Sequence, residues 1–236
     1  MFDFLPLSLA CLAFVGSHFA MSHPLRARLS GAMGERAFLG LYSAVSFLTL
    51  GLVVWAFLAA PAGVIHWAVG DKLWIGATVM MWVASILLVG SLFGNPALPG
   101  PTDHNRAEAR RQATRPAQGV FAITRHPMMW AFALWSLAHV LVMPSTANMI
   151  LTGSIAFLAL AGAKGQDIKK IHQMGTEWQG WQGRTSYLPF GQQMTGRASW
   201  SEAVPGFTVL VLGTALWLGA TWAHHGIGAG VWRWIG

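Results

Sequence analysis

Apolar residues along the chain fall in blocks of about 18 to 24, separated by shorter polar stretches rich in Pro and Gly. A helix rises about 1.5 Å per residue, so one such block can cross a hydrocarbon core about 30 Å thick. The pattern therefore predicts an all-α fold, a polytopic membrane helix bundle with about six transmembrane helices. The expected spans cover residues 4–22, 37–60, 73–93, 127–143, 146–164 and 205–223.

The connections between these spans differ in length and charge. The third, around residues 95–118, is a long polar loop in which the segment NRAEARRQA is compatible with a short amphipathic helix, and residues 165–204 form another polar stretch. The connections after the first, third and fifth spans carry three, five and five of the fifteen Lys and Arg residues. By the positive-inside rule these three connections are cytoplasmic and both termini are periplasmic.

Composition agrees with a membrane protein. Apolar residues make up 54% of the 236 residues and charged residues only 10%, too few to cover the surface of a soluble domain. Several of the thirteen Trp residues lie at block edges, where amphipathic rings favour the membrane interface. The net charge of +7 comes from the connections, so topology explains it and no nucleic-acid partner is expected.

Two histidines lie within the apolar blocks. His18 is in the first expected span and His139 is in the fourth. Ionisable groups are costly in lipid, and each imidazole is compatible with a hydrogen bond to a neighbouring helix. Two membrane histidines on different helices, among aromatic residues and Met, are also compatible with the axial ligands of one haem. The residues alone leave both interpretations open.

A third histidine, His126, stands with Arg125 and Pro127 at the cytoplasmic start of the fourth span. One interpretation is a snorkelling arginine beside an interfacial histidine. The other is a site for an anion or a haem propionate, because a guanidinium group matches a carboxylate and a helix start favours negative charge. His23, which precedes Pro24, is expected at the interface.

Other motifs exclude several kinds of site. The chain has no CxxC, HExxH, GxGxxG or P-loop motif in a suitable context, so neither a zinc nor a nucleotide site is expected. The adjacent His224 and His225 point about 100° apart on a helix and would chelate a metal poorly. The single cysteine, Cys11, excludes an internal disulfide.

Three stretches carry a family resemblance: FVGSHFAMSHPLRARL, GERAFLGLYSAVSFLTLGLVVW and TRHPMMWAFALWSLAHV. They resemble the NnrU family of bacterial inner-membrane proteins, which is associated with nitrite and nitric oxide metabolism in denitrifiers. The family is related to the plant and cyanobacterial 15-cis-zeta-carotene isomerases, which are haem b membrane proteins. The resemblance covers most of residues 1–190, including RTSYLPF, which is similar to an RTS-x-x-P-F motif of the isomerases.

The resemblance implies a ligand pair by position. His18 and His139 would be the axial ligands of haem b, and His126 would be a functionally important residue near the site. The isomerases carry a cysteine three residues before the second ligand, where this chain has Ser136. If the first pair fails, His23 and His126 are the reserve candidates.

The remaining site residues follow from this assignment. Haem propionates need cationic partners, and Arg125 and Arg26 are the expected ones. Trp135 and Ser136, near His139 on the fourth span, are expected to contact the cofactor. Residues 1–204 would form the haem-binding domain, and 205–236 an additional transmembrane helix and tail.

The expected function is therefore haem b binding in the bacterial inner membrane. Its role would be sensing or redox chemistry linked to nitric oxide, or cis–trans isomerisation of a polyene similar to zeta-carotene; the sequence does not decide whether the protein is an enzyme. A rival resemblance is to membrane methyltransferases that use S-adenosylmethionine, through TRHPMMW and TEWQGWQGRTSYLP. Those enzymes carry a pair of acidic residues where this chain has Gln166 and Asp167.

Overall fold

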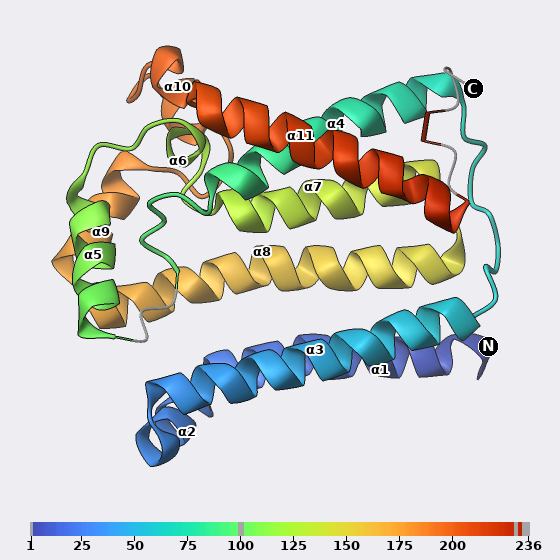
Figure 1. Ribbon diagram of the computed structural model, residues 1–236, viewed down its shortest axis with the longest axis horizontal. Helices are drawn as coiled ribbons and strands as arrows, with labels where there is room; N and C mark the ends of the chain where they lie inside the picture. Colours follow the sequence, from blue (N-terminus) through green and yellow to red (C-terminus); the bar gives the residue numbers. More distant parts are fainter. Residues whose placement is uncertain (1, 99–101, 229–230, 233–236) are drawn as a thin grey trace.

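The computed structural model of the protein describes residues 2–98, 102–228 and 231–232 (Figure 1). All regular structure in the described residues is helical, with no strand beyond one isolated bridge between Ile65 and Ser145. Five helical segments are long and apolar enough to cross a membrane: α1 (Leu5–Ser22), α3 (Glu35–Ala59), α4 (Asp71–Gly90), α8 (Thr146–Met174) and Phe207–Ile227. The last segment comprises α11 (Phe207–Ala223) and the short helix η3 (His224–Ile227). The predicted membrane helix bundle is confirmed.

The sixth expected span is a shorter helix. α7 (Pro127–Val142) is apolar but has 16 residues, which corresponds to about 24 Å of helix. It is packed between longer helices, α8 on one side and α4 on the other, so its ends need not reach both interfaces.

Helix α8 occupies the centre of the bundle. Figure 1 shows α7, α4 and α11 on one side of α8, and the pair α1 and α3 on the other. Leu7 and Cys11 of α1 form a small core with Val53 and Ala56 of α3 and Ala147 of α8. α8 therefore separates the first membrane helix from α7.

The structure corrects the expected end of the fifth span. The apolar block ends near residue 164, but α8 continues to Met174 and has 29 residues. The added residues include good helix formers such as Lys and Gln, so nothing in them breaks the helix. The helix ends at Gly175, whose positive φ of 59° is a conformation that glycine adopts readily. The last turns therefore carry polar residues beyond the hydrophobic core.

The end of the bundle that carries the short helices is called here the polar end. It holds α2 (Arg26–Met33), α5 (Asp103–Thr114), α6 (Val120–Ile123), α9 (Thr176–Arg184), α10 (Gly191–Met194) and η2 (Trp200–Ala203). α5 confirms the short amphipathic helix expected around NRAEARRQA. The first connection, expected as a loop, contains α2.

The opposite end carries the beginning of α1 and the end of α11 (Figure 1). The first and last membrane helices therefore have their outer ends on the same side of the bundle. The short helix η1 (Phe2–Phe4) precedes α1 at this end. Which compartment this end faces stays a prediction.

Candidate functional site

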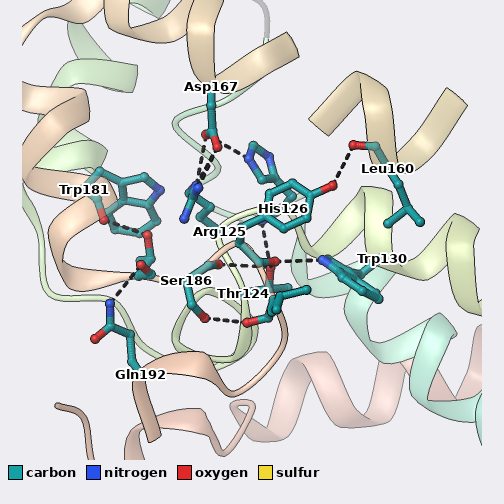
Figure 2. Close-up of polar contacts among 12 residues, drawn as sticks. Thr124, Arg125, His126, Trp130, Leu160, Asp167, Trp181, Ser186 and Gln192 are labelled. Atoms are coloured by element: carbon teal, nitrogen blue, oxygen red, sulfur yellow. Dashed lines mark hydrogen bonds and ion pairs between the residues drawn. The ribbon is translucent and has the colours of Figure 1, made fainter. Parts of the chain in front are cut away.

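A buried carboxylate organises the polar end of the bundle. Asp167, on the last part of α8, accepts hydrogen bonds from Arg125 Nε at 2.9 and 3.0 Å and from Arg125 Nη2 at 2.6 Å. His126 Nε2 lies 2.9 Å from Oδ1 of the same carboxylate. Only 2% of His126 and 6% of Asp167 are exposed. Figure 2 shows Arg125 and His126 both pointing toward Asp167.

The backbone around Arg125 is fixed by a segment far away in sequence. Thr124 to His126 link α6 to α7, and Pro127 begins α7 in a position where a missing N–H is tolerated. Arg125 N–H donates to the Ser186 carbonyl at 2.9 Å, and Thr124 Oγ1 donates to the Tyr187 carbonyl at 2.8 Å. The two motifs TRHP and RTSYLPF, which both carry the family resemblance, therefore lie side by side.

Tyr187 closes a further side of this cluster. Its ring lies 5.7 Å from the Arg125 guanidinium carbon and 5.9 Å from the His126 ring, which it meets edge-on. Its hydroxyl donates to the Leu160 carbonyl of α8 at 2.6 Å. Burial and the nearby charge of Asp167 raise the pKa of Tyr187, so its hydroxyl stays protonated and keeps this bond.

The contact with Asp167 also sets the chemistry of His126. A carboxylate only accepts, so Nε2 carries a hydrogen and donates it. In the described part of the chain, His126 Nδ1 is buried without a hydrogen-bond partner, and so is Nε1 of Trp178, whose ring lies 6.5 Å away. Asp167 thus fixes the hydrogen on one ring nitrogen, and the other ring nitrogen has no partner among the described residues.

The predicted ligands His18 and His139 share one local geometry. His18 Nδ1 donates to the Phe14 carbonyl at 2.7 Å, and His139 Nδ1 donates to the Trp135 carbonyl at 2.8 Å. Each ring therefore carries its hydrogen on Nδ1 and its lone pair on Nε2. Ser46 lies 3.3 Å from His18 Nε2, but its hydroxyl makes a shorter bond of 2.8 Å within its own helix. Among the described residues, no hydrogen-bond partner of His139 Nε2 is found.

The structure does not bring these two histidines together. Phe157 and Gly165 of α8 face α1, through Phe19 and His23, whereas Asp167 of the same helix faces α7. At about 100° per residue, Gly165 and Asp167 lie about 160° apart around α8, on nearly opposite sides. His18 contacts α3 through Tyr42 at 5.5 Å between ring centroids. His139 instead lies 6.2 Å from the His224 ring.

The other predicted site residues do not lie together at one site. Trp135 stacks on His139 with ring centroids 4.1 Å apart, and Ser136 is buried with its hydroxyl bonded back to Phe132. Arg26 pairs with Glu35 and does not join the contacts among Arg125, His126 and Asp167.

The reserve histidines His23 and His126 contact α8 two residues apart in sequence, at Gly165 and Asp167, on different faces. In the part of the chain that the structure describes, no group of three or more His, Cys, Asp or Glu is close enough to bind one metal ion.

Two members of the cluster were not among the predicted site residues. Asp167 was noted in the sequence only for its place in a methyltransferase-like pattern, and Tyr187 only as part of RTSYLPF. A useful signal was present, because Asp167 is an acidic residue close to an apolar helix that needs a partner. The partner cannot be identified from sequence spacing alone, since it lies about forty residues away.

Comparisons with known proteins agree with this arrangement of motifs. The model of the NnrU family, described as NnrU protein, matches residues 6–233. The chloroplastic 15-cis-zeta-carotene isomerase of Arabidopsis thaliana is 27% identical over 212 residues, which cover 81% of this chain. They cover 52% of the isomerase, so the chain spans about half the length of this relative. No solved structure matches the chain significantly. Because the family match extends over nearly the whole chain, this helical membrane protein belongs to the NnrU family.

Proposed function

We propose that this membrane protein binds haem b through His139 and a second histidine, for which the family resemblance names His18, for sensing or redox chemistry linked to nitric oxide. The observation that supports this most directly is the shared geometry of the two imidazoles. A backbone carbonyl fixes the hydrogen on Nδ1 of each ring, and the lone pair on Nε2 is then suited to a metal. Haem, when bound, would supply reversible electron transfer, and a small diatomic molecule would reach its iron only by displacing one of the two histidines.

The surroundings of His139 also suit a flat apolar cofactor. Trp135 stacks against the ring at an interplanar angle of 29° and restricts its rotation. Asn148 donates from its side chain to the carbonyls of His139 at 3.1 Å and Met143 at 2.8 Å, which ties the end of α7 to α8. Both contacts reduce the entropy cost of placing the ligand nitrogen.

One feature of the structure does not fit the predicted pair. α8 lies between α1 and α7, so His18 and His139 do not reach one iron in this arrangement. Binding of both to the same haem requires α1 to shift along or around α8. His224 is the imidazole that lies next to His139, and its Nδ1 also donates to a backbone carbonyl, at 2.6 Å. The second ligand is therefore the part of the proposal to test separately.

Single substitutions test which histidines bind the haem iron. The absorption spectrum and haem content of the purified full chain are measured for His139→Ala, His18→Ala and His224→Ala, with the exposed His66→Ala as control. We expect His139→Ala and His18→Ala to abolish the low-spin spectrum, and His66→Ala to leave it unchanged. If His224→Ala lost the low-spin spectrum and His18→Ala kept it, the second ligand would be His224. A normal spectrum in His139→Ala would contradict the proposal.

A second candidate function is suggested by the likeness to 15-cis-zeta-carotene isomerase. Under this proposal the chain isomerises a cis polyene that enters from the bilayer. Ser136 stands where those isomerases carry cysteine, and its hydroxyl is bonded within its own helix. Incubation of the reduced and oxidised protein with a 15-cis polyene, followed by chromatography, tests this activity. Conversion by the reduced protein supports isomerisation, and none in either state contradicts it.

A further inference from the structure

A cavity of about 330 Å³ lies at the polar end, apart from the Asp167 cluster. Its walls come from α2, the start of α3, α5, the end of α8 and the connection after α4. The charged residues that line it are Arg26, Glu35, Arg106, Arg110, Lys169 and Lys170. Five cationic side chains therefore share the cavity with one carboxylate. Its volume is within the range of sites for small molecules.

The three arginines already have anionic partners. Arg26 pairs with Glu35 inside the cavity. Arg106 pairs with Asp103 at 2.5 Å. Arg110 pairs with Glu177 at 2.9 Å, outside the cavity lining. These pairs balance the guanidinium charges, so the charge excess of the cavity resides on the lysines.

The two lysines are not balanced in this way. Among the described residues, no carboxylate lies within ion-pair distance of Lys169 or Lys170. Lys170 is only 5% exposed, and its ammonium group donates to the Leu98 carbonyl at 3.1 Å. An ammonium group has three hydrogens to donate, and burial without a counter-ion is costly. Two adjacent positive charges facing one cavity therefore favour an anion inside it.

The chemistry of the walls favours a phosphate group. Compact ammonium groups bind phosphate as point charges, and a phosphate ester or diphosphate carries about two negative charges, which matches the two unbalanced lysines. Basic pockets between membrane helices on the cytoplasmic side bind anionic lipid head groups. We propose that this cavity binds a phosphate-bearing anion, either a free phosphate compound or the head group of an anionic lipid. This site goes beyond the proposed haem function and does not depend on it.

Two probes distinguish the sources of the phosphate. Binding of inorganic pyrophosphate to the purified full chain is measured by equilibrium dialysis, and binding of phosphatidic acid, with phosphatidylcholine as the neutral comparison, by native mass spectrometry. The test variant is the double substitution Lys169→Gln with Lys170→Gln. Lys164→Gln is the matched control, because Lys164 is exposed on the same helix and does not line the cavity.

We expect wild type and Lys164→Gln to bind at least one probe equally well, and the double Gln variant to bind it at least about tenfold more weakly. The double variant Lys169→Arg with Lys170→Arg keeps both charges and should retain binding, which excludes misfolding as the cause. Pyrophosphate binding alone identifies a free phosphate compound, and selective phosphatidic acid binding identifies a lipid. No binding of either probe to wild type, or equal binding by the double Gln variant, overturns the proposal.

Discussion

Asp167 is the residue on which the contacts of the polar end converge. Its carboxylate meets the guanidinium of Arg125 and the imidazole of His126, and side-chain exposure is 13% or less for all three. A buried carboxylate is tolerated only when it is paired and fully hydrogen-bonded. These contacts join the start of α7 to the end of α8, so their loss affects two helices at once.

Asp167→Asn tests this role. The amide keeps the shape of the side chain but leaves the Arg125 guanidinium without its anion. We expect the free energy of unfolding to fall by about 3 kcal/mol or more, as when one partner of a buried pair is removed. Denaturant unfolding in detergent measures it. Asp103→Asn, on an exposed side chain of α5, should change stability by no more than about 0.5 kcal/mol. Equal effects of the two substitutions would contradict the account.

His23 gives a prediction for pH dependence. His23 is largely exposed, but desolvation of its ring where it meets α8, followed by the charge of Lys169, lowers its pKa below the ordinary value of 6.5. The folded state then resists protonation more than the unfolded state, so this contribution to stability is present above pH 6.5 and is lost as pH falls below it. His23→Gln should therefore weaken the loss of thermal stability between pH 7.5 and pH 5.5, about one unit either side of that value. An unchanged pH profile would rule out this contribution.

At the residue level, the sequence identified part of the site. Arg125 and His126 were singled out because a guanidinium and an imidazole at the mouth of an apolar helix need a partner. The sequence offered an anion or a haem propionate as this partner, and in the structure Asp167 contacts both residues. The sequence could not identify this partner because the pairing depends on how α8 packs against α7.

Among the elements, α4 and α11 approach each other closely at their backbones. A Cβ atom added to Gly213 of α11 would lie 2.8 Å from the Ile86 Cα of α4, closer than real atoms approach. Such backbone contact explains why a glycine stands there in spite of its poor helix propensity. Gly219 on the same helix has open space around the corresponding position.

The pair of variants Gly213→Ala and Gly219→Ala tests this contact. Alanine favours a helix over glycine by about 0.5–1 kcal/mol, so Gly219→Ala should leave the protein equally stable or more stable. Gly213→Ala must push α4 and α11 apart, and we expect it to cost about 1–3 kcal/mol. Thermal unfolding in detergent compares them. If the Gly213→Ala protein unfolded at a higher temperature than wild type, α4 and α11 would not pack as described.

At the element level, hydropathy located the membrane helices well and their ends poorly. The apolar block predicts residues 146–164, and α8 extends to Met174 because its polar turns still favour a helix. The extension carries Asp167 of the candidate site and the two lysines that line the cavity. Hydropathy measures transfer into lipid, so it does not detect a helix that continues into the polar region.

For the whole molecule, the positive charges determine the expected orientation. Three connections carry thirteen of the fifteen Lys and Arg residues, and in the structure those connections lie together at the polar end. Charges that were separate in the sequence thus meet at one side of the bundle. The division of the chain into residues 1–204 and 205–236 stays a prediction.

A topology experiment tests the orientation. We expect a reporter that is active only in the cytoplasm to be inactive when fused after Gly236, and active when inserted into the third connection. The reason is that positively charged connections are retained on the cytoplasmic side. Activity at both positions, or at the fusion after Gly236 alone, would contradict the predicted periplasmic termini.

The central claim is that this NnrU-family protein binds haem b in the membrane. The most direct measurement is the reduced-minus-oxidised absorption spectrum of the full chain purified from cells with ample haem, together with the haem content per chain. The account predicts about one haem b per chain and the sharp bands of low-spin iron with two nitrogen ligands. Correctly folded protein that contains no haem, and takes up none when haem is added, would contradict it.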